Sequence, residues 1–217
     1  MTRDAYHQEL REVEEAVVRM ATLVEDEIAR AMHALAQRDT QLAADVLAGD
    51  GAVNDLQRGI RNRCISIMAR QAPVARDLRE LITMQLVINE LERMGAHAVG
   101  IAKQTTRIAG FDLPPLASAL TEMAQLARQQ VRDVIQAFVD INVQAARDIC
   151  ARDDAIDHLY RQTFSELLER MTYDPAAIQV YTSLMFAAHD LERIGDRVTN
   201  IGEDIIYMVT GEIEELN

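Results

Sequence analysis

Acidic side chains recur at helical spacing near the C-terminal end of the chain, where residues 189–204 read HDLERIGDRVTNIGED. Glu192, Asp196 and Asn200 are separated by four residues each, and Glu203 follows one turn later. On a helix this spacing stacks the side chains on one face. The apolar seam of the same segment lies on another face, so the row should lie at the surface or between bundles. Such a row of oxygen ligands is a candidate site for a hard cation.

A second acidic pair, Asp153 and Asp157, has the same spacing of four residues. Its helix precedes the helix of the first row, and short connections make sequential helices antiparallel neighbours. The acids can thus converge from two helices, and a cation would turn their mutual repulsion into attraction. The sequence predicts the metal ligands Asp153, Asp157, Glu192, Asp196, Asn200 and Glu203. The alternative is a solvated acidic face whose carboxylates pair with Arg193 and Arg197.

A related string, NELERMGAHAVGIA at residues 89–102, lies about 100 residues before the C-terminal one. Its half of the chain retains Asp50, Asn54 and Glu92 as weaker candidate ligands. The remaining matched positions carry residues that do not suit a cation, namely Ala96, Gly100 and Lys103. We therefore expect the first site to bind metal poorly. Gly95 and Gly195 occupy matching positions, and a helix-interior glycine costs up to about 1 kcal/mol relative to alanine, so a close approach is expected there.

The elements that must position these residues are helices, because apolar residues recur with a period of about 3.6 over most of the chain. Breaks at 38–40 and 140–142, together with Pro73 and Pro175, repeat with an offset of about 100 residues. The predicted fold class is all-α: two tandem antiparallel three-helix bundles, with six long helices and a pseudo-repeat of about 100 residues. The first bundle comprises residues 1–110 and the second comprises residues 111–217.

Residues that cap or break helices mark the predicted boundaries. Asp39 or Thr40 can accept hydrogen bonds from the free N–H groups of the second helix. Asp140 or Asn142 can do the same for a fifth helix that reaches about residue 171. The clearest linker consists of Gly110, Pro114 and Pro115.

The composition excludes several classes of partner. A net charge of −13 over 217 residues argues against nucleic acid, whose binders need clustered Lys and Arg. No apolar run approaches the roughly 20 residues of a spanning helix, so no direct membrane insertion is expected. The charged N-terminus does not resemble a signal peptide, and Cys64 and Cys150 are interpreted as two buried thiols. These features predict a cytoplasmic protein, peripheral to a membrane only through partners.

The sequence pattern offers little for catalysis. None of the five histidines completes the Glu-x-x-His motif of ferritin-like di-iron bundles. Neither cysteine has an adjacent histidine or a CxxC spacing, which argues against a nucleophilic or redox thiol. We therefore predict a binding protein and not an enzyme. The alternative is a carboxylate-bridged metalloenzyme of the ferritin-like di-iron type, for which the acidic cluster is the only support.

Several stretches are similar to one known family. Its repeated LERIGD signature is similar to LERMGAHAVGIA and LERIGDRVTNIGEDI. The segment that opens its third helix is similar to ARQAPVARDLR at residues 69–79, and its first helix is similar to VEDEIARAMHAL at residues 24–35. Taken together, in order and over essentially the whole chain, these stretches resemble the PhoU family of phosphate-signalling regulators.

This resemblance implies two similar three-helix bundles whose E(D)xxxD motifs bind multinuclear clusters of divalent or trivalent metal ions. Iron or zinc is the expected metal, with Mg, Mn and Ca as alternatives. The implied function is non-enzymatic negative regulation of phosphate uptake and phosphate-starvation signalling. The implied partners are the ATPase subunit of a high-affinity phosphate ABC transporter and the phosphate sensor histidine kinase, and a homodimer is expected. Carried over by position, the ligands are Asp153, Asp157, Glu192 and Asp196, with Asn200 and Glu203 as further ligands.

Overall fold

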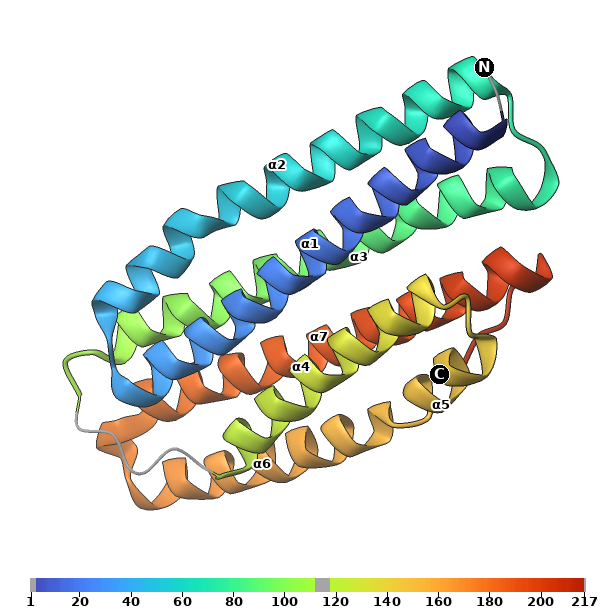
Figure 1. Ribbon diagram of the computed structural model, residues 1–217. Coiled ribbons are helices and arrows are strands. Elements are labelled where there is room, and N and C mark those ends of the chain that lie inside the picture. Colours follow the sequence, from blue (N-terminus) through green and yellow to red (C-terminus); the bar gives the residue numbers. More distant parts are fainter. Residues whose placement is uncertain (1–2, 112–117, 217) are drawn as a thin grey trace.

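The computed structural model describes residues 3–111 and 118–216, which form helices with no strand among them (Figure 1). The helices of the first half are α1 (Arg3–Gln37), α2 (Thr40–Gln71) and α3 (Ala75–Ile108). Those of the second half are α4 (Ser118–Val139), α5 (Val143–Cys150), α6 (Asp153–Tyr173), the 3-10 segment η1 (Pro175–Ala177) and α7 (Ile178–Thr210). The predicted all-α class with a repeated helical pattern is confirmed. The predicted linker residues Pro114 and Pro115 lie outside the described residues.

Helix starts in the two halves depend on the same local chemistry. The Asp39 carboxylate accepts a hydrogen bond from Leu42 N at 2.9 Å and caps α2. The Asn142 side-chain oxygen accepts one from Ala145 N at 3.0 Å and caps α5. Each cap satisfies a backbone N–H that the first helical turn leaves without a partner. The predicted breaks at 38–40 and 140–142 are confirmed, with Asp39 and Asn142 as the caps.

The predicted fifth helix is wrong in one respect, because Ala151 and Arg152 divide it into α5 and α6. Gln130, buried on α4, donates from Nε2 to the Arg152 carbonyl oxygen at 3.1 Å. Arg152 Nη2 also lies 2.9 Å from Asp133 Oδ2 on the same helix. These contacts from α4 stabilise the link, so tertiary packing overrides the local helical preference. As a result, Asp153 begins α6.

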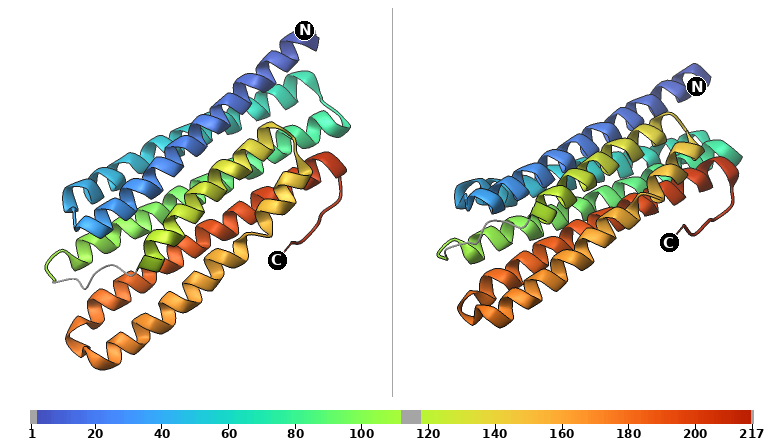
Figure 2. Two further views of the ribbon diagram at one scale, coloured as in Figure 1. Left: turned by 60° about the horizontal axis from the view of Figure 1, so that its bottom comes forward. Right: turned by 90° about the horizontal axis from the view of Figure 1, so that it is seen from below.

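Aliphatic side chains fill the interior of both halves in one continuous cluster. α3 and α7 make the most extensive helix–helix contact, while α1 and α2 pack on α3 and α4 to α6 pack on α7 (Figures 1 and 2). The seam predicted on the last helix is buried, including Leu191, Ile194 and Val198. None of the described helices is long and apolar enough to span a bilayer.

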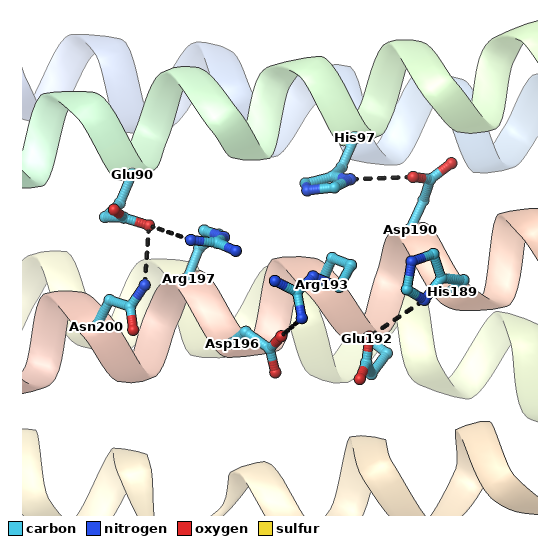
Figure 3. Close-up of polar contacts among 9 residues, drawn as sticks. All are labelled: Glu90, His97, His189, Asp190, Glu192, Arg193, Asp196, Arg197 and Asn200. Atoms are coloured by element: carbon cyan, nitrogen blue, oxygen red, sulfur yellow. Dashed lines mark hydrogen bonds and ion pairs between the residues drawn. The ribbon is translucent and has the colours of Figure 1, made fainter. Parts of the chain in front are cut away.

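Gly100 is needed for the close packing of α3 on α7. The Asp190 carboxylate of α7 occupies the space that a β-carbon on Gly100 would require. Asp190 Oδ1 also lies 3.0 Å from His97 Nδ1 on α3 (Figure 3). A glycine that looks like a lost ligand in the sequence comparison therefore has a packing role.

Candidate metal centre

Glu192 and Asp196 lie on the side of α7 that faces away from α3 (Figure 3). The buried seam of α7 includes Leu191 and Ile194 and directs this acidic pair away from the core. The side chains of Glu192 and Asp196 keep 19% and 25% of their exposure, respectively. The pair is therefore half-buried, with one side open to solvent.

Asp153 is the innermost member of the acidic cluster, which we define as Asp153, Asp157, Glu192 and Asp196. It is 7% exposed, and its Oδ1 has no hydrogen-bond partner among the described residues. Oδ1 lies 2.6 Å from the position that a β-carbon would take on Gly195. Only a glycine leaves room for this oxygen, which accounts for the close approach expected there. The sequence placed the acidic row of the last helix at the surface or between bundles, whereas Asp153 of the preceding helix is buried, because the α5–α6 link starts α6 against α7.

The four carboxylates share one negatively charged environment. Burial and then the charge of Asp157 raise the pKa of the Asp153 carboxyl to about 6, with smaller contributions from the two acids on α7 and an opposing one from the Thr199 side chain. Burial also raises the pKa of Glu192, and Asp196 is the next contributor. Both shifts reflect the cost of placing several like charges in a poorly solvated space. A cation among these groups would relieve that cost.

Arg193, Arg161 and His189 lie at the rim of the acidic cluster, and the two arginines neutralise part of its charge. The pairs, with their N···O distances, are Arg193–Asp196 at 2.5 Å, Arg161–Asp157 at 3.5 Å and His189–Glu192 at 3.5 Å. Of the two arginines that the alternative named, Arg193 pairs with the acidic cluster, whereas Arg197 pairs with Glu90 on α3. With the side chains in these positions, no three His, Cys, Asp or Glu residues within 3–111 and 118–216 are arranged to hold a metal ion.

The donor set nevertheless fits a hard cation. Asp153 supplies a buried oxygen without a partner, and the other three acids add carboxylate ligands of the type that such ions prefer. The competing pairs are weak, because the side chains of Arg161 and Arg193 are 70% and 36% exposed. Exposed ion pairs contribute about 0–1 kcal/mol. Displacing these arginines therefore costs less free energy than a cation would gain by pairing with the buried Asp153 carboxylate.

Asn200 and Glu203, also predicted as ligands, make contacts away from the acidic cluster. Asn200 Nδ2 donates to Glu90 Oε2 on α3 at 3.1 Å, and Arg197 Nη1 lies 3.3 Å from the same oxygen (Figure 3). Glu203 Oε1 accepts a hydrogen bond from Leu216 N at 2.8 Å. Asn200 thus joins the two halves, and Glu203 holds the C-terminal segment. The other four predicted ligands of the second half interact electrostatically with one another, but with the side chains in these positions no three of them are arranged to hold a metal ion.

In the first half, the three predicted ligands are only partly brought together. Asn54 Nδ2 donates to both Asp50 Oδ2 and the Asp50 carbonyl oxygen at 3.0 Å. Glu92 is half-buried on α3, and the residue one turn later is the exposed Ala96. The counterpart of the Glu192 and Asp196 pair is therefore reduced to one acid.

Sequence reasoning missed Glu27, which is the buried acid of the first half. It is 2% exposed, and neither of its carboxylate oxygens has a hydrogen-bond partner in the part of the chain that the structure describes. Oε2 lies 3.2 Å from the β-carbon position of Gly95, the glycine that matches Gly195. A signal was present, because Glu27 stands between Val24 and Ala31 on the apolar stripe of the first helix.

The fold and the acidic cluster place the chain in a class of all-helical proteins that consist of two repeats, each with carboxylates on its helices. The family model described as the PhoU domain matches residues 17–105 and 120–205, once in each half. A "Phosphate-specific transport system accessory protein PhoU homolog" from Clostridium acetobutylicum is 36% identical over 218 residues, covering 100% of both chains. A relative of the same name from Rhizobium meliloti is 36% identical over 208 residues, covering 95% of this chain and 88% of the relative. The chain belongs to the PhoU family.

Solved structures of the family have the same architecture. The crystal structure of PhoU from Pseudomonas aeruginosa aligns with a TM-score of 0.90 at 30% identity, covering 95% of this chain and 100% of that one. The phosphate transport system regulatory protein PhoU from Streptococcus pneumoniae aligns with a TM-score of 0.91 at 30% identity, covering 97% and 100%. The family predicted from the LER repeats is confirmed.

Proposed function

We propose that this protein is a non-enzymatic negative regulator of phosphate uptake, acting with a high-affinity phosphate transport system. The observation that carries the proposal is similarity over the whole chain to accessory proteins of phosphate-specific transport systems. Burial raises the pKa of both Cys64 and Cys150 to about 11, so these thiols stay protonated at neutral pH and are poor nucleophiles. This supports a role in binding and not in catalysis.

The acidic cluster is the proposed metal centre of this regulator, with iron or zinc as the expected ion. Asp153 would supply the innermost ligand and Glu192 and Asp196 the ligands on α7. The support is the unpartnered Asp153 oxygen beside Gly195 together with the shared negative charge of the four carboxylates. A bound cation would neutralise this charge and fix α6 against α7.

The proposed partners are the ATPase subunit of the transporter and a phosphate sensor histidine kinase, with a cytoplasmic homodimer as the working form. The net charge of −13 suits basic surfaces on another protein, because complementary charge steers association and favours the right partner. In this scheme the protein relays the state of the transporter to the kinase and keeps phosphate-starvation genes off when phosphate is plentiful.

Gene deletion tests the regulatory proposal directly. A strain that lacks the gene should express transporter and phosphatase genes in high phosphate, and the wild-type gene supplied in trans should restore repression. Repression that is unchanged in the deletion strain would contradict the proposal.

A further deletion of the sensor kinase tests the proposed route. Removing the kinase in the same strain should abolish the aberrant expression. Expression that persists without the kinase would show that the protein acts through another partner. The Asp153→Asn/Glu192→Gln variant, supplied in trans, then tests whether repression requires the acidic cluster.

A further inference from the structure

Aromatic side chains line an open groove between α6 and α7, which we call the aromatic groove. Its lining residues are Tyr160 and Phe164 of α6 and Thr182, Met185, Phe186 and His189 of α7. Phe164 and Phe186 are 37% and 51% exposed, although the chain has only four phenylalanines. The Tyr160 ring packs against both Phe164 and His189, with the ring centroids 6.1 Å apart in each pair.

The matching groove of the first half, between α2 and α3, contains polar side chains instead. The corresponding pairs, at the offsets that relate the helices of the two halves, are Gln57 with Tyr160, Arg61 with Phe164 and Asn89 with His189. Gln57 Nε2 and Arg61 Nη2 both donate to Asn89 Oδ1, at 3.1 Å and 2.6 Å. The fold therefore does not require aromatic residues at this place, and packing alone does not account for the aromatic groove.

The exposed apolar surface continues along α6 beyond the groove. Leu168, one helical turn after Phe164, is 46% exposed, and Tyr173 at the end of the helix is 80% exposed. Single exposed apolar side chains are normal, whereas a group of them marks an interaction site. Phe, Tyr and Met are also the residues that protein interfaces favour. The groove has a volume of about 300 Å³, which can accept a large apolar side chain, because a cavity of about 150 Å³ already holds benzene.

The charge around the aromatic groove selects the kind of partner. Residues 153–196, which include both walls of the groove, contain nine acidic residues, three arginines and no lysine. Without the four acids of the acidic cluster, acidic residues still outnumber arginines by five to three. His189 lies in the groove with its Nδ1 3.5 Å from Glu192 Oε2, so the acidic cluster borders the groove. Complementary charge therefore favours a partner with basic residues beside its apolar ones.

A second copy of the chain fits this surface poorly. A two-fold symmetric contact brings the same patch of both copies together. The acids that border the aromatic groove would then face their own counterparts, and like charges across an interface disfavour association.

We propose that the aromatic groove docks an amphipathic helix of a partner protein, whose apolar face is flanked by lysine or arginine. The apolar side chains of that helix pack on Phe164 and Phe186, and its basic side chains lie towards the acidic cluster. A groove between two helices suits this mode of recognition, in which a third helix lays its apolar face into the groove. The inference rests on the proposed regulatory function and deepens it by naming the binding surface and the chemistry of the partner.

Peptide binding to the full-length protein tests this proposal. The probe is a synthetic amphipathic helix of leucine and lysine, and the comparison peptide has glutamate in place of each lysine. Isothermal titration calorimetry at physiological ionic strength measures the affinity of both. We expect the lysine peptide to bind once per chain and the glutamate peptide not to bind. Phe164→Ser/Phe186→Ser should weaken binding of the lysine peptide at least tenfold.

A matched control is available on α2. The side chains changed in Leu47→Ser/Ile65→Ser are 38% and 52% exposed, almost the same as those of Phe164 and Phe186, and this variant should leave the affinity unchanged. All four side chains are exposed, so both variants should fold. The proposal is overturned if the lysine peptide does not bind, if the glutamate peptide binds equally well, or if the two variants have equal effects.

Two other occupants of the aromatic groove can be recognised with the same variant. Self-association of the wild type that Phe164→Ser/Phe186→Ser abolishes, measured by sedimentation equilibrium, would show that a second copy covers the groove. Binding to phosphatidylglycerol vesicles that the variant abolishes would show that the groove meets a lipid surface. Either result would overturn the proposal. None of these outcomes affects the proposed regulatory function, which gene deletion tests separately.

Discussion

The two halves bring a buried carboxyl group to matching glycines by different routes. In the second half, Asp153 begins α6 and its Oδ1 lies 2.6 Å from the β-carbon position of Gly195. In the first half, Glu27 reaches from α1 to within 3.2 Å of the corresponding position on Gly95. The helices that supply the two acids are not counterparts in the repeat. The buried acid thus lies beside the glycine of the LER repeat in both halves, but a different helix supplies it in each half.

The surroundings of these buried acids differ more strongly. Asp153 is accompanied by Glu192 and Asp196 on α7, which are half-buried and lie beside His189 and Arg193, respectively. The first half has Glu92 alone at the equivalent place, with Ala96 one turn later. The second half therefore holds several acids around its buried carboxyl group, whereas the buried Glu27 of the first half has fewer acids around it. The following predictions test this difference.

The largest expected effect concerns the metal content of the protein. Protein purified without chelator should lose most of its tightly bound metal in the Asp153→Asn/Glu192→Gln variant, because the buried ligand and a ligand on α7 are both removed. Glu92→Gln, at the counterpart of Glu192, should change the metal content much less. Elemental analysis by mass spectrometry measures both. Equal losses from the two variants would show that the outer acids of the two halves contribute alike.

Replacing the buried acid of the first half should stabilise the metal-free protein at neutral pH. The pKa of Glu27 is raised from 4.5 to about 7 by burial and by Asp50. The folded state thus binds this proton more tightly than the unfolded state, and stability falls as the pH rises through that interval. A shift of this size corresponds to at most about 3 kcal/mol. Glu27→Gln should recover much of that loss at pH 8 and little at pH 4.5.

Urea unfolding in EDTA measures this pH dependence. Asp153→Asn provides the comparison from the second half, because the pKa of Asp153 is raised only to about 6. The stabilisation by Asp153→Asn should therefore reach its full size at a lower pH than the stabilisation by Glu27→Gln. An advantage of Glu27→Gln over wild type that is the same at pH 4.5 and pH 8 would contradict the assignment of a buried, titrating carboxyl group.

A smaller effect should distinguish the two glycines. Gly195→Ala forces the short Asp153 side chain to move, because the new β-carbon would lie 2.6 Å from Oδ1. Overpacking of this kind costs about 1–3 kcal/mol, which exceeds the gain of up to about 1 kcal/mol in helix propensity. Gly95→Ala meets the longer Glu27 side chain at 3.2 Å, and a small shift relieves the contact. Unfolding free energies should fall for Gly195→Ala and change by less than about 1 kcal/mol for Gly95→Ala. Equal losses would contradict this reading.

The smallest expected difference is between the two thiols, one in each half. Cys64 and Cys150 are both buried, and burial raises the pKa of each to about 11. Iodoacetamide at pH 7.5 should therefore modify neither thiol in the folded protein and both in urea. Rapid modification of one thiol in the folded state, seen by mass spectrometry, would show that its half opens more readily.

Much of the local structure could be predicted from the sequence because it depends on neighbouring residues. The apolar period identified the helices, and Asp39 and Asn142 end up as caps because each lies three residues before the N–H that it accepts from. The break at Ala151 and Arg152 was missed because it depends on Gln130 and Asp133 of another helix. Spacing alone does not reveal such a contact.

The sequence by itself determined the helical repeat, the family and the four acids that α6 and α7 bring together. Only the tertiary structure decided which acids are buried and which already have partners. Asn200 has the spacing of a ligand but donates to Glu90 on α3, whereas Glu27 has no motif and lies beside Gly95 without a partner. The physical reason is that desolvation and pairing depend on which helices pack together, and spacing along a single helix does not encode that packing.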